Sequence, residues 1–316
     1  MSENYNRSGF VASNDPELFP PSKWNANVSV SFDDNVVPET QYSISDFRYV
    51  SPYKRDDAVI HFDLNGKSFF KKVFQAFPLS KTIQFHFNEK QIDTIIEQTR
   101  THSFSVTIDK DIFDNYSTKS SDILLSISSK LFLHIINELK KENDLMRFFY
   151  NGDGSDLIVD ILGSGEFKSQ YIPTISCYEY RKLSSLDVEK ELEIIISPLL
   201  LLRVLKSTDK QMKVIGFSFL CDSFEIILKT KSAIKVVNVC YSDSVYVYKV
   251  TRLKDINLSY PISPFYRVQK ALKISNEVNI SIYKNGLIDI TVLIKSIKDN
   301  VAAFKLYVVP QVDVDI

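Results

Sequence analysis

Short stretches of alternating apolar and polar residues, rich in β-branched and aromatic side chains, dominate the chain from Ala58 onward. A period-2 pattern bounded by polar turns predicts β-strands. The predicted strands lie at 58–64, 82–87, 102–108, 122–127, 146–150, 157–162, 170–180, 191–197, 213–219, 224–230, 234–239, 245–250, 278–283, 287–294 and 302–309. Segments 67–77, 129–143, 198–212 and 264–274 break this pattern and predict helices. The fold class expected is therefore α+β, with antiparallel sheets that carry their helices on one face.

Sequence signals mark where these helices begin and end. Ser197-Pro198 and Ser263-Pro264 each place a serine before a proline, which predicts a serine cap and a proline in the first helical position. Pro78 is expected to end the first helix.

The second half of the chain repeats the first. Asn285-Gly286 follows Asn151-Gly152 by 134 positions, and Ser263 follows Ser128 by 135. Segments 123–162 and 256–294 both predict strand, short helix, strand, turn and strand. A repeat of this length predicts two similar domains. We expect domains at 58–182 and 193–316 joined by 183–192, after an N-terminal extension, 1–57, that is partly disordered and has no counterpart in the second half.

The composition fits a protein with two ordinary cores. The 316 residues are 44% hydrophobic and carry a net charge of −1, so the overall charge predicts neither a nucleic-acid nor a membrane partner. Three widely spaced cysteines favour free thiols in a reducing compartment. The polar N-terminus lacks the apolar core of a signal peptide, and the longest apolar run, 194–205, is too short to span a bilayer. A soluble intracellular protein without a membrane partner is expected.

Positive charge is concentrated on the predicted helices. Segments 67–81, 197–213 and 263–275 carry net charges of +4, +3 and +3, whereas 128–144 is neutral. At 100° per residue, the cations of the third helix fall within an arc of about 80°. Exposed lysines often only solvate a helix face. Three such faces without balancing acids, however, favour a surface for a phosphate backbone.

An enzyme receives little support from the sequence. His61, His86, His102 and His134 have no cysteine or carboxylate at metal-ligand spacing nearby. The segment 151–156 (NGDGSD) lacks the full calcium-loop series and favours a hairpin turn. The GSG at 163–165 lacks the Lys and Ser/Thr of a phosphate-binding loop. No catalytic residue, metal site or cofactor is expected.

Four further segments are informative, namely NGKSFFKKVFQAF (65–77), FDNY (113–116), YEYRKLSSLDVEKE (178–191) and FKLYVVPQVDVD (304–315). In this order they resemble the PCNA-type DNA sliding clamp family. The resemblance spans roughly residues 58–314 and implies a closed ring, usually a homotrimer, with helices around the hole and sheets outside. It implies DNA-facing side chains at Lys71, Lys72, Lys130, Arg203, Lys206, Lys210, Arg267, Lys270 and Lys273. The implied function is a processivity factor that encircles double-stranded DNA without reading its sequence and tethers the replicative polymerase and repair factors.

The resemblance also implies two protein-binding surfaces. A pocket for clamp-interacting peptides is expected at Leu183, Leu186, Val188, Tyr307, Val309, Pro310 and Val312. A subunit interface is expected where the edge strands 175–181 and 234–239 meet, with Ile175, Tyr178, Tyr180, Ile234, Val236 and Val237. A clamp loader is a further expected partner.

Two alternatives remain open. One is a subunit of a heterotrimeric checkpoint-type clamp, and the other is a clamp-fold viral transcription or scaffold protein that forms no ring. The heavy use of Lys, Asn and Ile favours an AT-rich genome, such as that of a large DNA virus or a divergent unicellular eukaryote. The expected location is the nucleus, or the host cytoplasmic replication site for a viral protein.

Overall fold

The structure, a computed structural model, describes residues 57–65, 68–78, 80–141, 143–163, 166–175, 188–208, 211–219, 223–230, 232–240, 245–250, 256–295 and 301–311. The N-terminal extension before Asp57 thus lies outside the described residues, as do residues 183–187 of the predicted connecting segment 183–192. The predicted domain boundaries stay a prediction.

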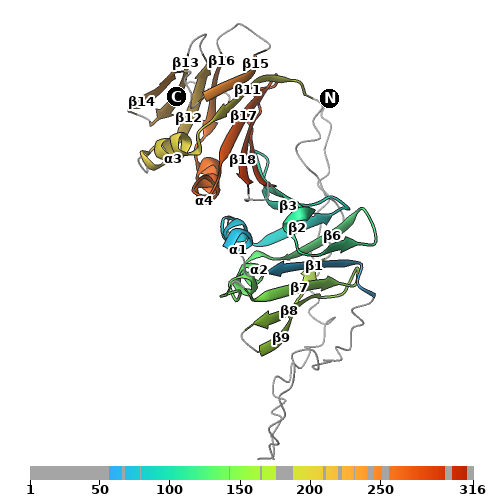
Figure 1. Cartoon of the computed structure of the whole chain (residues 1–316). Coiled ribbons are helices and arrows are strands. Elements are labelled where there is room, and N and C mark those ends of the chain that lie inside the picture. Colours follow the sequence, from blue (N-terminus) through green and yellow to red (C-terminus); the bar gives the residue numbers. More distant parts are fainter. Residues whose placement is uncertain are drawn as a thin grey trace, which may run out of the picture. The chain divides into compact units, whose positions relative to one another are not determined.

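The described elements run in the same order in the two halves (Figure 1). The first half contains β1 (Ile60–Asn65), α1 (Ser68–Gln75), β2 (Thr82–Phe87), β3 (Gln91–Gln98), β4 (His102–Asp109), η3 (Lys110–Ile112), β5 (Tyr116–Thr118), β6 (Ile123–Ser128), α2 (Ser129–Ile136), β7 (Leu145–Tyr150), β8 (Leu157–Gly163), β9 (Glu166–Ile172) and β10 (Thr174–Ile175). The second half contains β11 (Lys190–Ile196), α3 (Pro198–Lys206), β12 (Val214–Phe219), β13 (Ser223–Lys229), β14 (Ile234–Cys240), β15 (Val245–Val250), β16 (Ile256–Pro261), η5 (Ser263–Val268), α4 (Gln269–Leu272), β17 (Glu277–Tyr283), β18 (Ile288–Lys295) and β19 (Val301–Val308). These elements confirm the predicted α+β class.

The strands form three antiparallel sheets whose pairings repeat between the halves. Their orders are β5-β1-β7-β8-β9, β10-β6-β2-β3-β4-β19-β18-β17-β11-β15 and β14-β13-β12-β16. The set β5-β1-β7-β8-β9 corresponds to β15-β11-β17-β18-β19, and β6-β2-β3-β4 corresponds to β16-β12-β13-β14. The internal repeat predicted from the sequence is therefore present in the strand pairing as well.

One strand pair joins the two halves into a single sheet. β4 and β19 pair antiparallel over seven positions, from Ala302 opposite Ile108 to Val308 opposite His102. On the helix side of this sheet the rings of Phe77, from the end of α1, and Phe304, on β19, meet at 5.9 Å with their planes at 80°. The buried residues of both halves belong to one hydrophobic cluster. Burial of this continuous apolar layer is the main stabilising term.

The helices are shorter than predicted, and one predicted cap is wrong. Ser128 caps α2 through its side chain, which accepts a hydrogen bond from the Leu131 amide at 3.4 Å. Pro198 begins α3 as expected, but the Ser197 side chain at its N-cap makes no capping bond. The fourth helix begins as the 3-10 helix η5, whose N-cap is Ile262, so Ser263 is not its cap. Proline fixes φ at a value that suits the start of an α-helix or a 3-10 helix. The Ser-Pro pattern alone therefore did not show which residue is the N-cap.

A proline also divides one predicted strand. The pattern over 170–180 predicted a single strand, whereas β9 ends at Ile172 and β10 pairs with β6 across Thr174–Ile175. Pro173 between them has no amide hydrogen to donate to a ladder. Residues 176–180 lie outside the described residues.

The two Asn-Gly sites are hairpin turns, as predicted. Residues 151–156 connect β7 to β8, with φ of 110° at Gly152 and 80° at Gly154. Gly286 connects β17 to β18 with φ of 80°. Side chains other than glycine rarely adopt this conformation, so glycine is required at such turns.

Candidate nucleic-acid interface

The helix α3 presents apolar side chains to the sheet and cations to solvent. Leu201, Val204 and Leu205 are at most 3% exposed, whereas Arg203 and Lys206 are exposed. This separation follows from the helical period, because positions 201, 204 and 205 share one face of the helix. The exposed Leu199 is 66% accessible and lies outside that apolar face.

On the two helices of the first half, some cations are exposed to solvent and one makes a structural contact. Phe74 of α1 packs edge-on against Phe132 of α2, with their ring centroids 5.4 Å apart. Lys72 and Lys130 are exposed. Lys71 instead donates its Nζ to the backbone oxygen of Leu139 at 2.8 Å, so part of its role is to tie α1 to the chain after α2.

The fourth helical segment repeats the pattern. Phe265, Val268, Ala271 and Leu272 are at most 1% exposed, and Lys270 and Lys273 are exposed. Arg267 is half-buried.

Ion pairs engage some of the strand lysines but none of the exposed helix cations in the described residues. Lys168, Lys190 and Lys295 lie on strands and form ion pairs with carboxylates at 2.9, 3.1 and 3.7 Å. In the part of the chain that the structure describes, no such ion pair involves the exposed helix cations Lys72, Lys130, Arg203, Lys206, Lys270 and Lys273. Lys210, the remaining predicted DNA contact, lies outside the described residues. Unpaired ammonium and guanidinium groups are available to phosphate oxygens.

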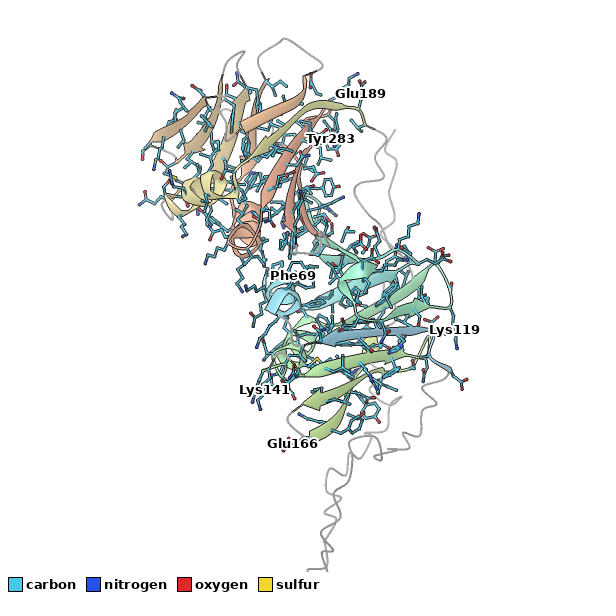
Figure 2. All side chains as sticks on the ribbon, in the orientation of Figure 1. Phe69, Lys119, Lys141, Glu166, Glu189 and Tyr283 are labelled. Carbon is cyan, nitrogen blue, oxygen red and sulfur yellow. The ribbon has the colours of Figure 1, made fainter. Side chains whose placement is uncertain are left out.

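Two of the terminal strands in the described sheets, β9 and β14, expose apolar side chains. β9 ends the five-stranded sheet and β14 ends the four-stranded sheet (Figure 2, in which Glu166 marks the start of β9). Ile234 and Val236 on β14 are 67% and 47% exposed, and Val237 packs against the core. Phe167 and Tyr171 on β9, which the sequence reasoning did not select, are 39% and 38% exposed. Exposed apolar residues on an edge strand favour pairing with another strand.

The other predicted interface residues are only partly described. Ile175 is 51% exposed and lies on β10, the short strand that ends the ten-stranded sheet, opposite Ser126 of β6. Tyr178 and Tyr180 lie outside the described residues.

The edge strand β9 is held against α2 by one carboxylate. Glu138, just after α2, accepts hydrogen bonds from Lys168 Nζ at 2.9 Å and Gln170 Nε2 at 2.7 Å. Partial burial acts to raise the pKa of Glu138, but these bonds and the nearby positive charge outweigh it, so its pKa lies below the usual value. His134 lies 4.0 Å from the same carboxylate.

The C-terminal segment, predicted to form the peptide pocket, crosses both halves of the fold. Val309 donates its amide to Thr101 O and Gln311 donates to Ser259 O, both at 2.8 Å. Val309 is 39% exposed, whereas Tyr307 on β19 is only 3% exposed. Val188 is half-buried ahead of β11, and Pro310 is half-buried after β19. Leu183, Leu186 and Val312 lie outside the described residues.

A close contact seats this segment on the turn between β17 and β18. A Cβ added to Gly286 would lie 2.9 Å from Pro310 Cγ. Beneath the turn, Tyr260 donates its hydroxyl to Gly286 O at 2.7 Å. Burial raises the pKa of Tyr260 above its ordinary value, so the hydroxyl remains a donor.

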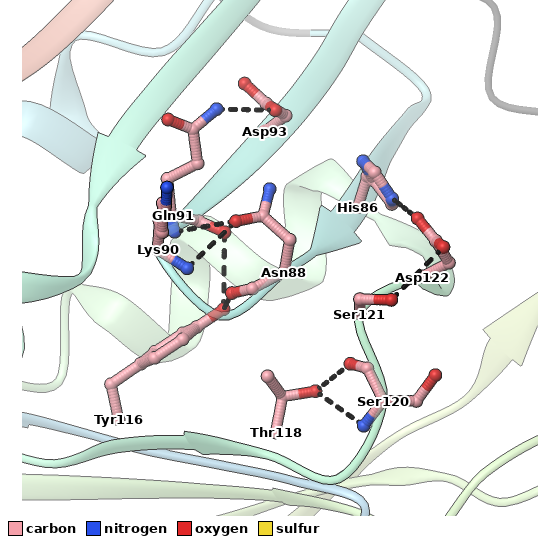
Figure 3. Close-up of polar contacts among 10 residues, drawn as sticks. All are labelled: His86, Asn88, Lys90, Gln91, Asp93, Tyr116, Thr118, Ser120, Ser121 and Asp122. Atoms are coloured by element: carbon pink, nitrogen blue, oxygen red, sulfur yellow. Dashed lines mark hydrogen bonds and ion pairs between the residues drawn. The ribbon is translucent and has the colours of Figure 1, made fainter.

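The FDNY segment forms a structural corner (Figure 3). Tyr116 donates its hydroxyl to Asn88 O at 2.6 Å, and Asn88 Oδ1 accepts from the amides of Lys90 and Gln91 at 2.9 and 3.0 Å. Burial raises the pKa of Tyr116, which keeps this donor protonated. Asn115 donates to Asp63 Oδ2 at 2.7 Å. The motif therefore fixes the β2–β3 turn and the end of β1.

The described ranges contain neither a metal-binding cluster nor a membrane-spanning helix. No group of three or more His, Cys, Asp or Glu side chains in these ranges is arranged to hold a metal ion. None of the helices described is long and apolar enough to cross a bilayer. His61 does pair with a carboxylate, Asp63, at 2.8 Å, a contact that the sequence reasoning missed. Arg147 and Asn115 also contact Asp63, so the pair belongs to a sheet-surface network.

Comparison with known proteins identifies the fold. No family model and no curated protein sequence matches the chain. Among solved structures, the chain is similar to the crystal structure of proliferating cellular nuclear antigen from Entamoeba histolytica, with a TM-score of 0.66. The match covers 81% of this chain and 100% of the other, at 12% sequence identity. The described residues thus have the fold of a PCNA-like clamp, with antiparallel sheets and few helices.

Proposed function

We propose that the chain is a DNA sliding clamp that encircles duplex DNA and tethers a DNA polymerase to it. The observation that carries this proposal is that all four helical segments of a clamp fold expose cations that form no ion pair within the described residues. Such a surface binds phosphates without reading base edges, so it holds the duplex at any sequence and allows sliding.

The strand topology supports closure of a ring. Within one chain, β4 of the first half pairs with β19 of the second. By the internal repeat, the equivalent strands are β14 and β9, and each of them lies at the end of its described sheet. A second copy can repeat the β4·β19 arrangement by joining its β9 to β14 of the first copy. Because this contact is head-to-tail, it closes into a ring only if the rotation between copies allows it. We propose three copies.

The ring explains processivity without tight contacts. Each phosphate contact is weak and screened by salt, so no single contact holds the protein at one place. Dissociation from circular DNA requires opening of a subunit interface. The closed ring, rather than tight binding, therefore keeps the protein and a bound polymerase on the template.

Partner proteins would dock on the surface near the C-terminal segment. The described residues there are Val188, Val309 and Pro310, and Val309 offers an exposed apolar side chain. We propose that polymerases and repair factors bind this surface through short peptides with apolar and aromatic residues.

Retention on circular DNA tests the central proposal. The purified chain, with a clamp loader if needed, would be incubated with nicked circular plasmid and separated from free protein by gel filtration at raised salt. We expect the protein to remain with the circle and to be lost when a restriction enzyme linearises it. Equal loss from both DNA forms would contradict encirclement.

The mass of the native assembly distinguishes the alternatives. A homotrimer in light scattering supports a ring made from this chain alone. A monomer that enters a ring only with two other chains would point to a heterotrimeric checkpoint-type clamp. A chain that forms no ring under either condition would support a clamp-fold transcription or scaffold protein.

A further inference from the structure

A cavity of about 720 Å³ lies between α3 and η5. Its apolar lining includes Leu205 and Ile262, which are 1% and 3% exposed, together with Met212. Concave sites with an apolar lining and a few placed polar groups are typical of small-molecule pockets. A phosphate alone needs no apolar surface, so the lining indicates a ligand with an apolar or aromatic part.

Two cations line the cavity from different parts of the chain. Lys206 is at the end of α3, and Lys213 precedes β12. Within the described residues, neither forms an ion pair with a carboxylate. Lys213 is fixed through its backbone, since its oxygen accepts from the Ile262 amide at 3.0 Å and its amide donates to Lys229 O at 3.2 Å. The ligand is therefore expected to carry negative charge as well.

An aromatic ring completes the lining. Tyr266 of η5 is 36% exposed, and its hydroxyl donates to Thr208 Oγ1 at 2.8 Å. This bond links η5 to the end of α3 and fixes the hydroxyl end of the ring. A partly exposed ring held beside lysines matches the combination that single-stranded nucleic-acid sites use, in which bases stack on aromatic side chains and cations follow the backbone.

We propose that this cavity binds one unstacked nucleotide of a single-stranded DNA segment, with the base against Tyr266 and the apolar lining and the phosphate near Lys206 and Lys213. The inference rests on the proposed function, because it places the cavity on the DNA-facing helices. A paired base in a duplex cannot present its face to a side chain, whereas a base in a single strand can. The cavity would thus hold a single strand where it leaves the duplex.

Binding measurements with two probes test this proposal. The probes are a fluorescein-labelled oligothymidylate of about ten nucleotides, within the usual site size, and a blunt duplex of similar length. Fluorescence anisotropy would be measured for the full chain and for Tyr266→Leu, Tyr266→Phe and Lys270→Gln. Tyr266→Phe retains the ring, and Lys270 is a cation of the neighbouring helix that does not line the cavity. Circular dichroism melts would confirm that each variant is folded.

Each variant has a distinct expected result. Tyr266→Leu should weaken oligothymidylate binding roughly tenfold through loss of one stacked base, and change duplex binding less than about twofold. Tyr266→Phe should retain most of the affinity, and Lys270→Gln should weaken both probes by similar factors. Equal effects of Tyr266→Leu on both probes, or none on either, would overturn the proposal.

The wild-type chain provides an independent check. An oligonucleotide that carries 5-iododeoxyuridine would be cross-linked by light and mapped by mass spectrometry. We expect the adduct on the peptide that contains Tyr266, and adducts confined to other peptides would overturn the proposal. If the protein is retained on circular duplex DNA but does not bind oligothymidylate, the cavity proposal fails and the clamp proposal stands. If it binds oligothymidylate but is not retained on circular DNA, the clamp proposal fails and the cavity proposal stands.

Discussion

Lys168 Nζ lies 2.9 Å from Glu138 Oε2 and thereby joins the edge strand β9 to the segment that follows α2. Gln170, two residues further along β9, donates to Oε1 of the same carboxylate. These two contacts hold β9 on the side of the segment that follows α2. One edge of β9 pairs with β8, and its outer edge has no partner strand in the described sheets. This arrangement presents β9 in an ordered conformation, which lowers the entropy cost of adding a strand.

The first prediction concerns the pH dependence of this contact. Because the pKa of Glu138 is lower in the folded protein than its ordinary 4.5, the carboxylate stabilises the fold above that value, and the stabilisation is lost as pH falls through the folded pKa. Glu138→Gln should cost about 1 kcal/mol near neutral pH. Urea denaturation at several pH values should show the difference between wild type and variant closing in acid. As a control, Glu277→Gln, which removes the 3.7 Å pair with Lys295, should cost less than about 0.5 kcal/mol. A difference that persists unchanged in acid would contradict the assignment to Glu138.

The second prediction separates backbone strain from a steric contact. Gly286 and Gly154 both have φ of 80°, but only at Gly286 would a Cβ meet another atom within 4 Å, namely Pro310 Cγ at 2.9 Å. Gly154→Ala should cost about 1 kcal/mol from backbone strain alone. Gly286→Ala should cost at least about 1 kcal/mol more and should shift the C-terminal segment. Thermal unfolding would give the two costs, and proteolysis would report on the segment. Equal losses of stability in the two variants would show that the contact with Pro310 adds no destabilisation.

The third prediction tests the open edge of β14. Val236→Lys places a charge on an exposed side chain, so the fold should be retained while strand pairing between copies is opposed. We expect the main species in light scattering to change from an assembly to a monomer. Leu199→Ser removes an exposed apolar side chain from α3 and should leave the assembly unchanged. An intact assembly in Val236→Lys would exclude β14 from the interface.

The fourth prediction concerns the cations of α3. The double substitution of Arg203 and Lys206 by Ala should weaken duplex binding and reduce the slope of log K against log salt by up to about 2. Lys90→Ala combined with Lys110→Ala removes the same charge from exposed positions outside the four cationic helical segments and should leave the slope unchanged. Lys71 is a poor choice for this test, because its bond to Leu139 O gives it a structural role. Equal effects of the two double variants would indicate a general charge effect.

The sequence was sufficient to predict most strands, the repeat and the cationic helix faces. These features depend on local periodicity, and Arg203 and Lys206 occupy exposed positions because Leu201 and Leu205 must face the sheet. β3 was not predicted, although its residues QIDTIIEQ alternate at the start. The pattern is interrupted where the register shifts between Ile95 and Glu97. A bulge of this kind shifts the alternation and hides the strand from a period-2 search.

The contacts between distant segments could not be predicted from local patterns. The bond from Lys71 to Leu139 O joins residues 68 positions apart, and the cavity beside Tyr266 depends on how η5 lies against the end of α3. The interface strand of the first half was expected at 175–181, of which residues 176–181 lie outside the described residues, and the edge strand β9 was not selected. Apolar alternation indicates that a strand exists, but it does not indicate which neighbour it pairs with.

The pairing of β4 with β19 has a consequence for biosynthesis. About 190 residues separate the two strands, so this contact raises the contact order of the fold and closes a long loop late in folding. On the ribosome, β4 and β18 emerge before the strand that lies between them, and both expose backbone donors and acceptors until Val301–Val308 follows. A nascent chain stalled before residue 301 would therefore offer two templates for aggregation and is expected to need chaperone protection.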